Sequence, residues 1–120
     1  MSSYKELKVY QKSYELMLAV YREISKKMPP EERYGLTSQV KRAAASIPLN
    51  VAEGYGRQAG AREVARFIQM ARGSCCEVSV LLDMLKDLGY VTEEDHERYA
   101  SGYEEIGKML TGLLKSLTKN

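Results

Sequence analysis

The sequence predicts an all-α protein that folds as an antiparallel, up-down-up-down four-helix bundle. Three observations support this fold class. Apolar residues recur at spacings of three and four along four long stretches, which is the period of one helix face. No stretch alternates apolar and polar residues as a strand does. Short segments that contain proline or glycine separate the stretches, and 120 residues fit a single domain over residues 1–120.

The first helix is predicted to begin at a capping box and to continue for about 24 residues. In this box the Ser3 hydroxyl would accept a hydrogen bond from the Glu6 amide, and the Glu6 carboxylate would reach back. Lys26 and Lys27 suit the negative carboxyl end of a helix, and the run Met28-Pro29-Pro30 would end it.

The remaining helices are predicted over residues 36–56, 61–88 and 92–117. The run Gly54-Tyr55-Gly56 is expected to end the second of the four helices, and Gly89 to cap the third. Thr92 would cap the fourth. The apolar face of residues 61–88 is broader than one partner helix needs, which predicts that another copy of the chain covers part of it.

Pro48 lies inside the second predicted helix and stays in phase with its apolar stripe. A proline at this position removes the hydrogen bond to the Ala44 carbonyl and costs about 3 kcal/mol unless something compensates. We therefore predict a kink near Pro48 rather than a break. Ser46 and Asn50 are close enough in sequence to bond the freed backbone groups.

Bulk properties narrow the class of protein. The sequence contains no run of about 18 apolar residues, so it predicts no membrane-spanning helix. The first residues do not show the pattern of a secretory signal. Cys75 and Cys76 are adjacent and point about 100° apart in a helix, so they are unsuited to bridging each other. Cys75 is expected in the core, with a redox or metal role as the alternative. A cytoplasmic location, without a membrane partner, is the default expectation.

The sequence contains no complete catalytic or metal signature, so we expect a protein that is not an enzyme and that needs no cofactor or metal. His96 is the only histidine. The pattern Glu93-x-x-His96 matches half of a di-iron bundle motif, but the complete site needs two such halves and two further glutamates. A Cys–His pair would require the fold to bring Cys75 across the bundle.

The charges are unevenly distributed although the net charge is only +2. Residues 33–72 contain seven basic and two acidic groups, whereas residues 73–107 contain two basic and nine acidic groups. Such asymmetry serves an anionic partner, pairs one copy of the chain with another, or reflects two solvated helix faces. The sequence leaves these three interpretations open.

Five basic residues are the candidate nucleic-acid-binding site: Lys41, Arg42, Arg57, Arg62 and Arg66. Arg62 and Arg66 are four residues apart and are expected to face outward together. Such a surface neutralises phosphates, so replacing both arginines by glutamate should weaken a salt-sensitive interaction. The alternatives are a solvated face or salt bridges between subunits. Nine tyrosines can stack on bases, but most lie in the helical stripes, which favours core packing.

Several motifs occur in order along the chain, at residues 6–12, 35–39, 46–57, 71–77 and 87–90. The most specific is Ile47-Pro48-x-Asn50-x-Ala52-Glu53-Gly54. Over roughly residues 4–91 the sequence strongly resembles the four-helix bundle protein family encoded in intervening sequences of 23S ribosomal RNA genes. That family also includes the accessory variability protein of diversity-generating retroelements.

The resemblance implies a bacterial, cytoplasmic bundle that assembles as a homopentameric barrel. For the retroelement members it implies binding of nucleic acid and of a reverse transcriptase through a basic surface. It implies no catalytic residue. The structural motif positions that match are Pro48, Asn50, Glu53, Gly54, Arg57, Arg72 and Glu77, and the charged ones are hypothesised to make polar contacts between helices or subunits. The alternative function is a protein-interaction scaffold without nucleic-acid affinity.

Overall fold

The computed structural model describes residues 3–58 and 60–118, and within these ranges it contains helices and no strand. The all-α prediction is confirmed. The long elements are α1 (Lys8–Ala19), α3 (Leu36–Gly56), α4 (Ala61–Asp87) and α5 (Glu93–Thr118). Shorter elements connect them: η1 (Tyr4–Glu6), the π-helix η2 (Val20–Ile24), α2 (Ser25–Lys27) and η3 (Pro30–Glu32).

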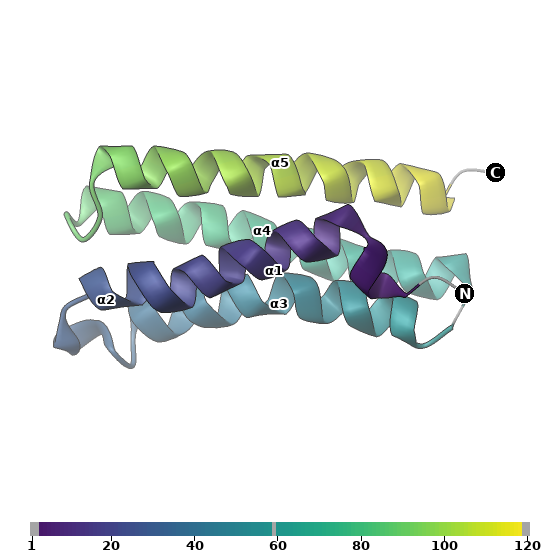
Figure 1. Cartoon of the computed structure of the whole chain (residues 1–120), viewed down its shortest axis with the longest axis horizontal. Helices are drawn as coiled ribbons and strands as arrows, with labels where there is room; N and C mark the ends of the chain where they lie inside the picture. Colours follow the sequence, from purple (N-terminus) through teal and green to yellow (C-terminus); the bar gives the residue numbers. More distant parts are fainter. Residues whose placement is uncertain (1–2, 59, 119–120) are drawn as a thin grey trace.

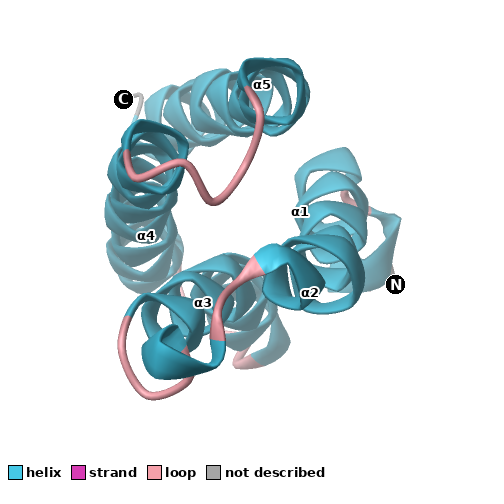
Figure 2. Cartoon of the chain, turned by 90° about the vertical axis from the view of Figure 1, so that its left-hand side faces the viewer, coloured by secondary structure: helices cyan, strands magenta, loops and turns pink. Residues whose placement is uncertain are grey.

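The helices lie side by side along an axis of 46 Å. Figure 1 shows the chain passing along this axis in α1, back in α3, along it again in α4 and back in α5. Seen end-on in Figure 2, the four long helices surround a common interior. The main contacts join α3 to α4 and α4 to α5, and α1 packs on both α3 and α5. The interior is filled by apolar side chains such as Ile47, Ile68 and Leu82, which are completely buried.

The first helix differs from its prediction at its start, whereas its predicted end is confirmed, because the helical run through η2 and α2 ends at Lys27, directly before Met28. The Ser3 hydroxyl accepts a hydrogen bond from the Lys5 amide, and the Glu6 amide bonds the Ser3 backbone carbonyl, so a 3-10 turn forms in place of a capping box. Leu7 is then extended, and α1 begins only at Lys8. A serine that bonds an amide two residues ahead favours such a turn over helix initiation.

A turn of π-helix, η2, was not foreseen from the sequence. The Ser25 amide bonds the Val20 carbonyl, five residues back, and the Ser25 hydroxyl donates to the Tyr21 carbonyl. The hydroxyl therefore supplies a hydrogen bond to the Tyr21 carbonyl, which the wider turn would leave without a partner. Val20 and Ile24, at the two ends of η2, are both completely buried. The π-helical turn thus begins and ends at residues whose side chains lie in the core.

Helix α3 continues through Pro48, and the predicted kink stays a prediction. The Asn50 side-chain amide donates to the Ser46 carbonyl at 2.9 Å and to its hydroxyl at 3.0 Å. The Ser46 and Ser74 hydroxyls lie 2.7 Å apart and connect α3 to α4. These polar side chains therefore hold the turn that contains the proline and fasten it to the neighbouring helix. The bonded carbonyl is that of Ser46, not that of Ala44.

Gly54 lies buried inside α3, two residues before the helix ends at Gly56. A Cβ atom at this position would be 3.0 Å from the Cβ of Phe67, so Gly54 permits close approach of α3 and α4. The helix ends after Gly56, and the left-handed residue that follows is Gln58, with φ 56°. The prediction that the run Gly54-Tyr55-Gly56 ends the helix is therefore confirmed, and the structure adds the close contact that Gly54 permits with α4.

The turn between α4 and α5 confirms its predicted caps. Gly89 has φ 82°, and the Tyr90 amide bonds the Leu85 carbonyl at 2.9 Å, as in a Schellman motif. The Thr92 hydroxyl accepts a hydrogen bond from the Asp95 amide at 3.0 Å. Helix α5 therefore begins where the sequence places it.

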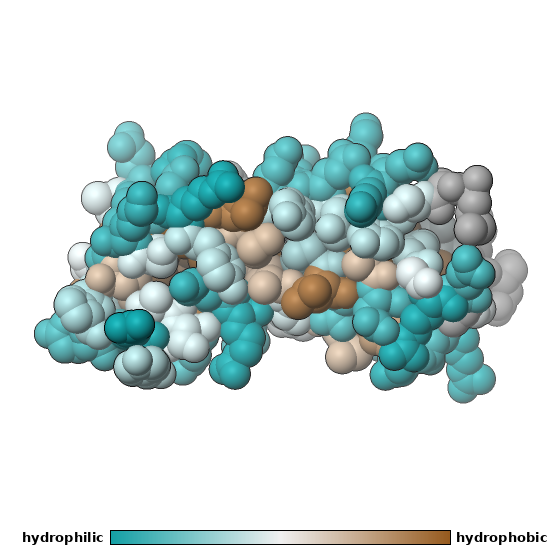
Figure 3. Space-filling model, turned by 60° about the horizontal axis from the view of Figure 1, so that its bottom comes forward, coloured by the Kyte–Doolittle hydropathy of each residue, from teal (hydrophilic) through white to brown (hydrophobic). Residues whose placement is uncertain are grey.

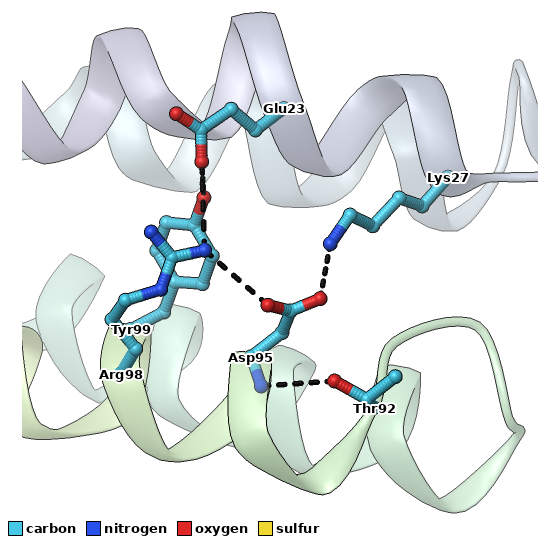
Figure 4. A network of polar contacts seen from close by, with 6 residues as sticks. All are labelled: Glu23, Lys27, Thr92, Asp95, Arg98 and Tyr99. Carbon is cyan, nitrogen blue, oxygen red and sulfur yellow. Dashed lines mark hydrogen bonds and ion pairs between the residues drawn. The ribbon is translucent and has the colours of Figure 1, made fainter.

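A polar network fastens the start of α5 to η2 and α2 (Figure 4). Asp95 pairs with Lys27 and, at 3.3 Å, with Arg98. The buried Tyr99 donates its hydroxyl hydrogen to Glu23. Burial and this hydrogen bond raise the pKa of Tyr99 to about 12. The hydrogen bond from Lys27 is the main cause that lowers the pKa of Asp95.

Tyr99 makes stability depend on alkaline pH. An unfolded tyrosine loses its proton near pH 10, before the folded one does, so the unfolded state gains stability between pH 10 and 12. We expect the free energy of unfolding to be fully retained below pH 10 and to fall by about 1–2 kcal/mol from this residue as pH rises to 12. Urea unfolding at several pH values measures this decrease in the free energy of unfolding. A Tyr99→Phe variant with an equally steep decline would contradict the assignment.

Candidate nucleic-acid interface

Two of the five candidate cations line one groove along the outer side of α3. The groove has a volume of about 890 Å³. Lys41 and Arg42 are neighbours on α3, within the stretch from Ser38 to Leu49 that lines the groove. Tyr21 of η2 and Phe67 of α4 also line it, as do Arg33 and Tyr34 from the segment before α3. We call these residues the α3 groove.

The α3 groove is positively charged. Lys41 has its Nζ 4.7 Å from the ring centre of Tyr21, and the Arg33 guanidinium lies 5.4 Å from that of Tyr34. Neither cation forms a salt bridge within the described residues, and the same holds for the exposed Arg42. Glu53 is the one acidic residue that lines the groove, and it pairs with Arg57 at 2.6 Å. Three basic groups thus face solvent without an acidic partner among the described residues.

The other predicted cations lie elsewhere and are partly neutralised. Arg66 makes two hydrogen bonds to Glu63, at 2.8 and 3.2 Å, and stacks over Phe67 with its guanidinium 4.7 Å from the ring centre. Arg57 approaches the same ring from 5.1 Å. Arg62 and Arg66 are both exposed and line a second groove beside the end of α5. Lys41 and Arg42 therefore line the α3 groove and Arg62 and Arg66 a second groove. Arg57 lines neither, but it lies over Phe67, which lines the α3 groove.

The charged motif residues make fewer contacts than hypothesised. Glu53 and Arg57 pair with each other along α3, four residues apart, and not between helices. Arg72 and Glu77 are exposed on α4, and neither makes a salt bridge within the described part of the chain. Arg72 lines a third groove, together with Lys108 of α5. Contacts from Arg72 or Glu77 to another subunit remain a prediction.

Three tyrosines are more exposed than core packing predicts. The exposed fraction is 43% for Tyr14, 41% for Tyr21 and 87% for Tyr34. Figure 3 brings the α3 side of the molecule toward the viewer and shows apolar surface between hydrophilic side chains. Tyr34 lies outside every helical stripe, directly before α3, and this position is the sequence signal for its exposure. Tyr99 and Tyr103, in contrast, are buried as expected.

Helix α4 exposes a second, apolar surface. Met70, Val80, Met84 and Leu88 are 48, 59, 40 and 54% exposed. At 100° per residue their positions fall within a sector of about 80°. We call these four residues the α4 face. Met70 belongs to the broad apolar face that the sequence predicts for this helix, whereas Val80, Met84 and Leu88 lie outside that predicted face. None of the four lines the α3 groove.

Nothing in the described ranges resembles a metal centre or an activated nucleophile. No group of three or more potential metal-ligating side chains occurs there. Cys75 is in the core, as predicted, with its Sγ 3.2 Å from the Tyr103 carbonyl oxygen, and burial raises the pKa of its thiol to about 11. His96 bonds Asp83 at 2.7 Å and connects α5 to α4. No helix among the described residues has the length and apolar character needed to cross a membrane.

The structure is an all-helical bundle with a cationic groove along α3 and an apolar face of α4 that is open to solvent. The chain belongs to the 23S rRNA-intervening sequence protein family, whose model matches residues 5–112. The match confirms the resemblance and extends it into α5. A protein of unknown function from the S23 ribosomal protein family of Bacteroides thetaiotaomicron VPI-5482 has a similar crystal structure. The TM-score is 0.81 at 22% identity, over 89% of this chain and 98% of that chain, which shows a shared fold. A search of curated proteins found no match.

Proposed function

We propose that this protein is a non-enzymatic, homopentameric scaffold of the bacterial cytoplasm that binds nucleic acid through the α3 groove. The observation that carries the proposal is the set of three cations, Arg33, Lys41 and Arg42, that face solvent in one groove without acidic partners among the described residues. Phosphates supply the negative charge that such a groove lacks, and each contact releases counterions. The absence of a cofactor requirement belongs to the same proposal.

A charge-reversal series tests the groove. We expect Lys41→Glu with Arg42→Glu to weaken binding of a labelled 20-base-pair duplex about 100-fold at low salt, because two attractive contacts become repulsive. The corresponding double alanine variant should make the salt dependence of log K less steep by about two. Arg62→Glu with Arg66→Glu should weaken binding less, since Glu63 already neutralises Arg66. Fluorescence anisotropy measures all three.

Lys108→Glu with Lys115→Glu is the matched control, because it changes the net charge equally on α5. Binding by this variant should stay within threefold of the unchanged chain. A loss as large as that of the Lys41 and Arg42 variant would show that net charge matters and not the groove. No binding by the unchanged chain at low salt would reject the proposal and favour a protein-interaction scaffold, for which the exposed α4 face is the supporting observation.

A reverse transcriptase is the protein partner that we propose in addition, by analogy with the accessory variability proteins. The analogy rests on the family resemblance. The overall charge of +2 with an acidic later half speaks against a uniformly basic docking surface, so the α3 groove would have to supply the contact. Co-purification with a reverse transcriptase encoded beside the gene tests this partner, and loss of the complex in the Lys41 and Arg42 variant would place it at the groove.

A further inference from the structure

The α3 groove combines cations with an aromatic ring that is open to solvent. Tyr34 is 87% exposed, the most exposed of the large hydrophobic side chains, although an aromatic ring in water contributes nothing to folding. The Arg33 guanidinium lies 5.4 Å from its ring centre, so one ring face is occupied. The side chain therefore stands at the groove with aromatic surface still accessible.

The second exposed tyrosine of the groove has a different environment. Tyr21 is 41% exposed and carries the Lys41 ammonium 4.7 Å from its ring centre. The cation is thus held over an aromatic ring within the groove, where phosphate can reach it. Leu49, 66% exposed, adds apolar surface two turns beyond Arg42. The span from Ser38 to Leu49 along α3 is about 16 Å, long enough for a short stretch of extended strand.

We propose that the α3 groove binds single-stranded nucleic acid, with an unstacked base on Tyr34 and the backbone phosphates on Lys41 and Arg42. This inference rests on the proposed function and narrows its ligand class. In a duplex the flat faces of the bases are covered by their neighbours, so only phosphates reach the groove. In a single strand each base offers its face to an aromatic side chain, and this stacking tolerates any sequence.

The test compares single strands with a duplex. The probes are labelled oligo(U) and oligo(dT) of 20 nucleotides and a duplex of 20 base pairs, each measured by anisotropy at low salt. We expect the unchanged chain to bind the single strands more tightly than the duplex. Tyr34→Ala should weaken single-strand binding about 10-fold and leave duplex binding within twofold, because one stacked base is lost and no phosphate contact is. Tyr34→Phe should restore single-strand binding, since it keeps the ring.

Two controls separate stacking from other effects. Tyr14→Ala removes a tyrosine that is 43% exposed but does not line the α3 groove, and it should leave binding of all probes unchanged. The salt dependence should stay the same in Tyr34→Ala but become less steep in Lys41→Ala. The circular dichroism spectra of Tyr34→Ala and Lys41→Ala should match that of the unchanged chain, because Tyr34 and Lys41 lie outside the buried core.

Each outcome decides between the two proposals. The single-strand inference is wrong if Tyr34→Ala weakens binding of single strands and of the duplex equally, or weakens binding of neither. In that case, loss of binding in the Lys41 and Arg42 variant would still support the proposed function. If the unchanged chain prefers the duplex, the inference is also wrong. If it binds no probe, both proposals fail. Similar affinity for oligo(U) and oligo(dT), which differ in the 2′-hydroxyl and in the 5-methyl group of the base, would support contacts to phosphates and base faces alone.

Discussion

A chain that carries Val80→Glu and Met84→Glu is expected to be a folded monomer. Both side chains belong to the α4 face, at 59 and 40% exposure, and two turns of α4 would then present carboxylates beside Glu77. Apolar area buried between copies is worth about 25 cal/mol per Å², and uncompensated carboxylates at such an interface oppose association. Light scattering should give about five times the chain mass of 13.6 kDa for the unchanged protein and one chain mass for the variant.

Leu49→Glu is the matched control for assembly. Leu49 is more exposed than either residue of the α4 face, at 66%, but it lies in the α3 groove. This variant should keep the mass of the unchanged protein. A monomeric unchanged protein would remove the pentamer from the proposal, and an assembled Val80 and Met84 variant would show that the α4 face does not hold the copies together.

Gly54→Val is expected to destabilise the fold by about 2–3 kcal/mol. A Cβ atom at this position would already lie 3.0 Å from the Cβ of Phe67 and 3.5 Å from the Val64 carbonyl oxygen, and the two methyl groups of valine need further room. Because Gly54 is buried between α3 and α4, the helices would have to separate. The thermal midpoint should fall by about 10 °C at the same protein concentration.

Gly56→Val provides the comparison two residues away in the same helix. A Cβ atom at Gly56 would meet nothing within 4 Å, so valine there should be neutral or stabilising by a few tenths of a kcal/mol. An equal loss of stability in both variants would mean that the close contact with Phe67 is not the cause, because valine has a higher helix propensity than glycine. An unchanged thermal midpoint in Gly54→Val would mean that α3 and α4 can separate to admit the valine with little loss of stability.

The sequence predicts the existence and order of the helices because periodicity and caps are local signals. Thr92 and Gly89 show this, since each cap can be recognised from its own residue type and its neighbours. The π turn at η2 could not be predicted, because it depends on packing of Val20 and Ile24 against helices that are distant in the chain. The contact of Gly54 with α4 could not be predicted for a similar reason: a glycine near a helix end and one that admits a neighbouring helix look alike without the neighbour.

The candidate site was predictable in residue type but not in grouping. Lys41 and Arg42 are adjacent in sequence and share the α3 groove. Arg66 has the same residue type, but Glu63 three residues earlier neutralises it, and such a pair could have been noticed from the i, i+3 spacing. The contribution of Tyr21 and Arg33 depends on how η2 and the segment before α3 fold back onto the helix. Only the three-dimensional structure brings these residues together.

The α3 groove and the α4 face have no residue in common. A ring closed through the α4 face would leave every copy's groove unobstructed by those four side chains, and so display several equivalent sites on one particle. When a polymer is long enough to reach two of these sites, binding at the first site is bimolecular. Binding at the second is intramolecular and occurs at a high effective concentration. Such a particle would retain long strands far more firmly than short ones, although each individual site is weak.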